Sequence, residues 1–269
     1  ASLCADGIMS LWSMFCLTRS VRRVEKKLKE EEVVLTIRRN RENIRIKTKA
    51  VRDVKKEYKL GIWVRDNVQG LGTITFLTKN NTFAALGHGI HDIDTSTLLT
   101  IKRGTLYRTS IQKVQKGSKG NPGTMEGIIV YNRFHRLGVI EKNTDAGIYG
   151  ELNSDRSWIG EEVPIQVAKK EEIKMGEARI RCYIDGEVKE YTICITQIDK
   201  ESDQVNKGMV IQVTDTELLE KTGGIIQGMS GSPIIQNGKL IGAVTHVFVQ
   251  DSTKGYGIFI ENMLKEEES

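Results

Sequence analysis

The chain has 269 residues, of which 39% are hydrophobic and 28% are charged. This balance excludes a chain that is disordered throughout and indicates a soluble globular protein of one large domain or two ordinary ones. The 40 Lys and Arg residues are interspersed with 35 Asp and Glu residues, and no basic stripe carries interleaved aromatic residues. This pattern argues against a nucleic-acid-binding protein.

The first 50 residues predict a small α+β segment. Residues 1–20 show no clear periodicity, whereas residues 21–30 place their apolar side chains at helical spacing. Residues 31–40 (EEVVLTIRRN) and 42–51 (ENIRIKTKAV) then predict the two strands of a hairpin. A helix followed by a terminal hairpin is typical of the end of a PDZ domain, of which about 50 residues would form only the C-terminal half. A small α+β appendage is the equal alternative.

After a charged connector at residues 51–60, the sequence pattern changes to one typical of an all-β protein. Short runs rich in Val, Ile and Thr alternate with Gly, Asn and Asp, a pattern typical of a barrel or sandwich. Strands are predicted near residues 61–65, 71–78, 82–86, 97–102, 105–115, 126–131, 137–141, 145–149, 163–167, 177–184, 187–198, 208–213, 233–236, 239–249 and 255–260.

The four cysteines predict neither a metal site nor an internal disulfide in the all-β region. None of them forms a C-x-x-C pair, so we expect no zinc and no cofactor. Asp185-Gly186 is a two-residue turn signal that places residue i opposite residue 371 − i, because 185 and 186 add to 371. Cys182 would face Lys189, and Cys194 would lie on the opposite side of the sheet, which excludes a bond between the two cysteines.

The segment GMSGSP at residues 228–233 has the features of a nucleophile loop. A nucleophilic serine needs an accessible hydroxyl and two backbone N–H groups that stabilise the oxyanion of the tetrahedral intermediate. Glycine two residues before Ser230 would let the N–H groups of Gly228 and Ser230 converge on that oxyanion. A strand, an Asn-Gly turn and a second strand follow, which is the C-terminal-barrel layout of chymotrypsin-like proteases. An ordinary Gly/Ser-rich loop is the alternative.

The segment TFAALGHG at residues 82–89 presents His88 at the end of an apolar strand. Its small residues would let the imidazole lie close to the backbone at a barrel rim, where it could take the Ser230 proton and return it to the leaving amine. His88 also precedes Ser230, as the chain order of this fold requires. A structural role is predicted for the other three histidines: His91, His135 and His246.

An acid that orients His88 should complete the site. Asp145 opens a strand of small apolar residues and lies between His88 and Ser230 in the sequence. Asp215, fifteen residues before Ser230, is the rival, and a dyad without an acid is the third option. Thr245, on the strand after the nucleophile, would wall the specificity pocket, although an ordinary β-branched strand residue would look the same.

Several of these motifs together resemble one family. GIWVRD, G-x-G-T-x-T-F, A-L-G-H-G-I, the loop GSKGNPG and the stretch GMSGSPIIQNGKLIGAVTHVFV are similar to the SpoIVB-type sporulation serine peptidases, peptidase family S55. The segment before them resembles the end of the PDZ domain that precedes the peptidase in this family. The resemblance thus implies a partial PDZ-like segment at residues 1–50 and a peptidase domain at 51–269, with a chymotrypsin-like double β-barrel.

The resemblance also implies a function. The family consists of serine endopeptidases of endospore-forming bacteria, secreted from the forespore into the space between the two membranes. There the peptidase would cleave a membrane-bound regulatory protein, and itself, and so release an intramembrane protease that matures a late sigma factor. No export signal is visible in this chain, which begins with Ala, and we expect it to be a fragment.

Carried over by motif, the histidine of the family falls on His88 and its serine on Ser230. Its acid falls near Asp215 whereas the fold order favours Asp145, so both stay candidates. Thr245 matches a family position that matters for activity. A catalytically silent barrel that binds a peptide or a membrane partner is the alternative function.

Overall fold

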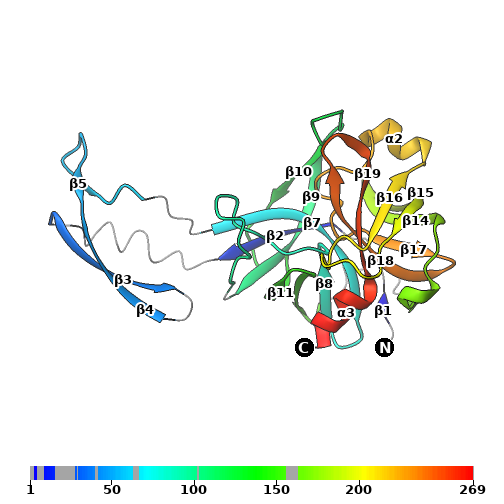
Figure 1. Ribbon diagram of the computed structural model, residues 1–269, viewed down its shortest axis with the longest axis horizontal. Coiled ribbons are helices and arrows are strands. Elements are labelled where there is room, and N and C mark those ends of the chain that lie inside the picture. Colours follow the sequence, from blue (N-terminus) through cyan, green and yellow to red (C-terminus); the bar gives the residue numbers. More distant parts are fainter. Residues whose placement is uncertain are drawn as a thin grey trace. The chain divides into compact units, whose positions relative to one another are not determined.

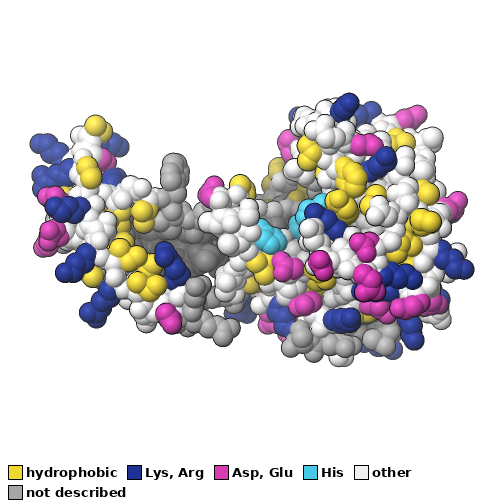
Figure 2. All heavy atoms as spheres, in the orientation of Figure 1, with side chains coloured by type: hydrophobic (Ala, Val, Ile, Leu, Met, Phe, Trp, Pro, Cys, Tyr) yellow, Lys and Arg dark blue, Asp and Glu magenta, His cyan; other side chains and the backbone are white. Residues whose placement is uncertain are grey.

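The computed structural model of the protein describes residues 3–4, 9–15, 28, 30–39, 42–62, 67–101, 103–155 and 163–268. It divides into two compact units, which are the segment Phe15–Val68 and a larger unit of Ala1–Met14 with Gln69–Ser269 (Figure 1). None of the described helices is long and apolar enough to cross a membrane. On the face of the larger unit drawn in Figure 2, basic and acidic side chains are intermixed.

The smaller unit contains the hairpin that the sequence predicts. Strands β3 (Glu32–Arg39) and β4 (Glu42–Lys49) pair antiparallel over their whole length. Two short strands, β5 (Val51–Arg52) and β6 (Tyr58–Lys59), form a second pair. Most of the helix predicted at residues 21–30 lies outside the described residues. The assignment of this segment to a truncated PDZ domain therefore stays a prediction.

The C-terminal barrel is a closed antiparallel ring of six strands. The successive pairings run β17–β14–β15–β16–β19–β18 and return to β17. Alternate residues of these strands are buried, as in Met209, Ile211 and Val213 of β16, and they fill the barrel. The six strands are β14 (Gly176–Ile184), β15 (Glu187–Ile198), β16 (Met209–Val213), β17 (Pro233–Gln236), β18 (Lys239–Phe248) and β19 (Asp251–Phe259).

The N-terminal barrel contains a run of paired strands in the order β7–β8–β12–β11–β9. Strand β2 pairs with both β7 and β9 and so connects the two ends of the run, while β10 extends the sheet beyond β9. The strands are β2 (Met9–Phe15), β7 (Asn67–Thr78), β8 (Thr82–Ala85), β9 (Gly104–Gln115), β10 (Thr124–Ile129), β11 (Arg136–Thr144) and β12 (Gly147–Leu152). The predicted all-β double barrel is confirmed.

Short strands join the two barrels. Strand β1 (Leu3–Cys4) pairs with β7 on one side and with β13 (Pro164–Val167) on the other, and β13 runs parallel to β18. Sequence reasoning found no element in residues 1–20, so β1 and β2 are additions made by the structure. The strand predicted at residues 97–102 is wrong, because only Leu98 pairs there, in an isolated bridge to His91.

The described residues of the larger unit also contain three helical segments, none of which was predicted. They are the 3-10 turn η1 (Lys170–Glu172), α2 (Thr216–Thr222) and α3 (Ile260–Glu268). The predicted register of the β14–β15 hairpin is confirmed, with Cys182 opposite Lys189 and Cys194 opposite Glu177. Both cysteines are free, as that register requires.

Candidate active site

The loop that carries Ser230 is held against strand β7 of the N-terminal barrel by two fully buried threonines. Thr73 donates from its hydroxyl to the Gly228 carbonyl at 3.1 Å and from its N–H to the Ser230 carbonyl at 2.9 Å. Thr75 donates its hydroxyl to the Gly231 carbonyl at 2.8 Å. A buried hydroxyl left without such a bond costs on the order of 1–3 kcal/mol. These bonds therefore fix the loop to the opposite barrel.

Gly231 allows this close approach. Its φ is 94°, a conformation that side chains rarely adopt. A Cβ atom there would lie 2.1 Å from the Thr73 carbonyl oxygen and 2.6 Å from the Leu86 nitrogen. On its other side, Gly231 donates its N–H to the Val244 carbonyl on β18 at 2.7 Å. Glycine is thus required where the loop passes between the two barrels.

The segment that carries His88 also contacts strand β18. After β8 the chain turns through two left-handed residues, Leu86 (φ 71°) and Gly87 (φ 68°). A Cβ on Gly87 would lie 2.9 Å from Ile258 Cγ2 and 3.1 Å from Thr245 Cγ2. The backbone just before His88 therefore packs directly on β18 and β19. The two predicted site segments meet at β18.

The imidazole of His88 is half-buried and has one hydrogen-bond partner among the described residues. Its Nδ1 lies 2.9 Å from the carbonyl oxygen of Gly89. Because a carbonyl oxygen can only accept, Nδ1 carries the proton in this arrangement and Nε2 keeps its lone pair, as a general base requires. Burial lowers the pKa of His88 below the ordinary value of 6.5; the Gly89 bond opposes this change and the charge on His91 adds to it.

His246 packs against His88, with the two ring centroids 4.5 Å apart and the ring planes inclined by 36°. Sequence reasoning predicted a structural residue inside an apolar strand. No sequence signal marked this contact, because residues 240–245 of β18 are all buried without alternation and His246 is the first exposed residue after them. Removal of part of the ring from water lowers the pKa of His246, and the charge on His88 lowers it further.

The hydroxyl of Ser230 donates to the backbone carbonyl of Thr245, with 2.8 Å between the oxygens. Ser230 is partly exposed, and within the described part of the chain its hydroxyl forms no hydrogen bond to His88. The backbone N–H groups of Gly228 and Ser230 donate to no acceptor among the described residues. The two predicted oxyanion donors are therefore not consumed by internal bonds.

Asp145 lies in the turn between β11 and β12, beside the segment that carries His88. A Cβ on Gly89 would lie 2.6 Å from the carbonyl oxygen of Thr144, which shows how closely the two segments pack. The Asp145 carboxylate oxygen lies 3.4 Å from Nε2 of His91. Nδ1 of His91 lies 3.1 Å from the Gly89 carbonyl, the group that also binds His88. Among the described residues, the link from Asp145 to His88 runs through His91 and Gly89.

Asp215 occupies a structural position at the start of α2. One carboxylate oxygen accepts the N–H of Leu218 at 3.1 Å, which is the N-cap bond of the helix, and the other accepts the N–H of Thr192 at 3.1 Å. Neither Asp145 nor Asp215 bonds His88 in the residues that the structure describes. The geometry brings His88 and Ser230 to one strand and leaves the acid a prediction.

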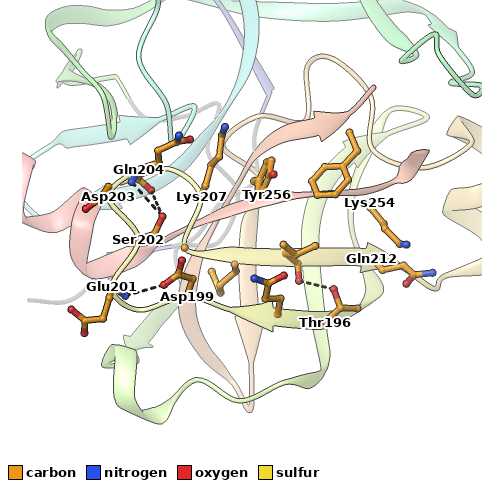
Figure 3. Close-up of a pocket in the computed structure, with 15 residues that line it drawn as sticks. Thr196, Asp199, Glu201, Ser202, Asp203, Gln204, Lys207, Gln212, Lys254 and Tyr256 are labelled. Atoms are coloured by element: carbon orange, nitrogen blue, oxygen red, sulfur yellow. Dashed lines mark hydrogen bonds between the residues drawn. The ribbon is translucent and has the colours of Figure 1, made fainter. Parts of the chain in front are cut away.

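Thr245 is buried, and its hydroxyl donates to the Asn206 carbonyl at 2.8 Å. A substrate contact at this position would have to come from the backbone. Asn206 belongs to the loop between β15 and β16, which lines a cavity of about 740 Å³. Figure 3 shows Lys207, Tyr256 and Lys254 along one side of this cavity and Asp199 and Glu201 across from them.

The cavity therefore lies next to the strand that carries Thr245.

Among the described residues, no group of three or more His, Cys, Asp or Glu side chains could hold a metal ion.

A comparison with family models identifies the family of this chain. The family model described as SpoIVB peptidase S55 matches residues 56–264. The chain is similar to the active form of the Rv3671c protease from M. tuberculosis, with a TM-score of 0.41 and 11% identity over 97% of this chain and 79% of that one. It is also similar to the HtrA-type protease AlgW with a tripeptide, with a TM-score of 0.42 and 12% identity over 73% of this chain and 54% of that one. For Deg5, the TM-score is 0.39 and the identity is 15% over 73% of this chain and 80% of that one. No curated protein matches the chain.

Proposed function

Because this chain belongs to the SpoIVB peptidase S55 family and is therefore a serine peptidase, we propose that Ser230 is its nucleophile and His88 its general base. The observation that carries the proposal is the meeting of both segments at β18. The Thr245 carbonyl binds the Ser230 hydroxyl, while the backbone before His88 packs on the side chain of the same threonine.

The proposed reaction begins with a change of partner for the serine hydroxyl. Rotation about χ1 moves the Ser230 proton from the Thr245 carbonyl to Nε2 of His88, and Oγ attacks the peptide carbonyl carbon. The N–H groups of Gly228 and Ser230 hold the resulting oxyanion. The His88 imidazolium then gives its proton to the leaving amine, and water hydrolyses the acyl-enzyme by the same steps.

This change of partner gives Thr245 a role in substrate binding. An extended peptide on β18 would donate a backbone N–H to the Thr245 carbonyl, the acceptor that Ser230 occupies in this structure. The bound substrate would thereby displace the Ser230 hydroxyl toward His88. We assign the substrate contact to the backbone oxygen of Thr245 and leave its buried hydroxyl to hold Asn206.

Of the two acids, we propose Asp145 as the residue that supports His88. Its turn packs on the His88 segment, and its carboxylate reaches the Gly89 carbonyl through His91. In this arrangement Asp145 is a positioning residue, and the Gly89 carbonyl holds the His88 tautomer directly. Asp215 is engaged elsewhere by two backbone N–H groups.

The role of Asp215 can be tested by substitution. Asp215→Ala removes the helix N-cap and should lower the free energy of unfolding by about 1–2 kcal/mol, measured by denaturant unfolding. Asp215→Asn keeps an N-cap acceptor and should retain turnover near that of the wild type. An Asp215→Asn protein that unfolds like the wild type but has lost turnover by several orders of magnitude would instead make Asp215 the catalytic acid.

A second test concerns the contact between His246 and His88. Since His88 must be neutral to act as base and its pKa lies below 6.5, kcat/KM should reach its plateau by neutral pH and fall only in more acidic solution. His246→Ala exposes the His88 ring to water, which favours the charged form and raises its pKa. The acid limb of the kcat/KM–pH profile should therefore move to higher pH.

The matched control for this shift is His135→Ala, which removes a histidine from a loop of the N-terminal barrel and should leave the limb in place. A purely structural role for His246 would lower the amount of folded enzyme without moving the profile. An unmoved limb in His246→Ala, with normal folding, would show that the contact does not set the basicity of His88.

For the biological role we propose an endopeptidase of sporulation. The match to the SpoIVB peptidase family supports a sporulation peptidase, and we propose that it cleaves a membrane-bound regulatory protein, and itself, in the space between the forespore and mother-cell membranes. That cleavage would activate an intramembrane protease and a late sigma factor. The direct test is digestion of an unfolded protein by the purified chain. Fragments should appear and should be suppressed by a fluorophosphonate, whereas peptide binding without cleavage would favour a silent barrel.

A further inference from the structure

On the N-terminal barrel, exposed apolar side chains are concentrated at the end of β10 and in the loop that follows it, while Ile93 is exposed separately in the segment after β8. Ile128, Val130, Tyr131 and Phe134 are all exposed, and Phe134 is 81% accessible to solvent. We call residues 128–136 the 128–136 surface. Scattered exposed apolar residues are ordinary, whereas four within seven positions of one segment are a concentration of apolar surface of the kind that interaction sites show.

The exposure is a property of an ordered segment. The side-chain oxygen of Asn132 accepts the N–H of Phe134 at 3.0 Å and the N–H of His135 at 2.9 Å, and it lies 2.8 Å from Nδ1 of His135. The ring of Tyr131 packs edge-on against Tyr107 of β9, with 5.4 Å between the centroids. The loop therefore presents Phe134 in a fixed position, and a partner would bind it without having to order the loop.

The charged side chains within the segment itself are all basic. Residues 127–140 contain no Asp or Glu, while Arg133 and Arg136 lie within the segment. Arg108 of β9 is tied to it by a backbone hydrogen bond to the His135 carbonyl at 2.8 Å. In the part of the chain that the structure describes, none of these three exposed arginines forms an ion pair with an acidic side chain. The surface is therefore complementary to a negatively charged partner.

We propose that the 128–136 surface docks on a membrane that contains anionic phospholipid. Guanidinium groups bind phosphate in a bidentate way, and aromatic side chains favour the interface between headgroups and acyl chains. A nucleic acid would also satisfy the arginines, but Ile128 and Val130 gain nothing from a phosphate backbone. At the headgroup boundary of a bilayer they leave water together with Phe134, while the arginines stay among the phosphates.

The test is sedimentation of the full chain with vesicles. Vesicles of phosphatidylglycerol and phosphatidylcholine should carry the protein down, vesicles of phosphatidylcholine alone should not, and added salt should weaken the binding. Arg133→Gln/Phe134→Ser removes one charge and one apolar side chain from the surface, and it should weaken binding by about tenfold or more. Its matched control is Lys174→Gln/Met175→Ser, an exposed basic and apolar pair on the other barrel, which should bind as the wild type does.

Two outcomes would overturn the proposal. One is no binding of the wild type to anionic vesicles; the other is equal binding by the Arg133→Gln/Phe134→Ser protein and the wild type. If the wild type bound a short DNA duplex in preference to vesicles and the Arg133→Gln/Phe134→Ser protein did not, the partner of this surface would be a nucleic acid. Ser230→Ala should bind vesicles like the wild type, so that failure of the catalytic assignment leaves this result untouched.

Discussion

Replacement of Ser230 by Ala is expected to lower turnover of a peptide substrate by roughly four to six orders of magnitude, as the loss of a nucleophilic serine does in other serine proteases. In the acylation step of the proposed reaction, Ser230 Oγ is the atom that forms the bond to the substrate carbon. The fold should survive the change, because the loop keeps its bonds to Thr73 and Thr75 and loses only the Ser230 hydroxyl bond to Thr245. That loss should lower the free energy of unfolding by about 1 kcal/mol.

The same loop offers a matched control in Ser232. Its side chain is fully buried, and its hydroxyl has no hydrogen-bond partner among the described residues. Ser232→Ala therefore removes an unsatisfied polar group and should leave stability unchanged or improved, with turnover near that of the wild type. Turnover by Ser230→Ala at a level close to that of Ser232→Ala would end the assignment of the nucleophile.

His88→Gln is expected to lower turnover by about four orders of magnitude or more, measured with the same substrate at the same pH. Glutamine can still donate a hydrogen bond to the Gly89 carbonyl, so the segment should stay folded, but its amide cannot take the Ser230 proton. His135→Gln serves as the control, because His135 lies in the loop between β10 and β11 and contacts Asn132 instead.

The effects of Ser230→Ala and His88→Gln on turnover should not be additive. If His88 acts only by accepting the proton of Ser230, the Ser230→Ala/His88→Gln protein should be no less active than Ser230→Ala alone, within about threefold. Losses that multiply in the double variant would mean that the two residues act independently. In that case the histidine contributes something other than general-base catalysis.

Local patterns predicted much of the barrel architecture. The turn signal at Asp185-Gly186 determined the pairing of a whole hairpin, and the structure has Cys182 opposite Lys189 as that turn requires. Helix α2 could also have been predicted, since Asp215 is a favoured N-cap residue and Gly223 ends the helix in a left-handed conformation. The helix was missed because the segments on both sides of it have strand patterns.

Other features depend on contacts between distant segments and could not be predicted. Strand β2 has no periodicity of its own and is defined by pairing with β7 and β9. The sequence identified Ser230 and His88 by their flanking residues, but nothing local placed His246 on the ring of His88 or the Ser230 hydroxyl on a carbonyl of β18. Those contacts exist only after both barrels have closed.

The central claim is that Ser230 is a nucleophile activated by His88, and its most direct test is labelling with a fluorophosphonate followed by peptide mapping. The account predicts one modified residue, Ser230, with labelling that is lost in His88→Gln and retained in Ser232→Ala. A folded chain that takes up no label, or that carries the label on a different serine, would contradict it.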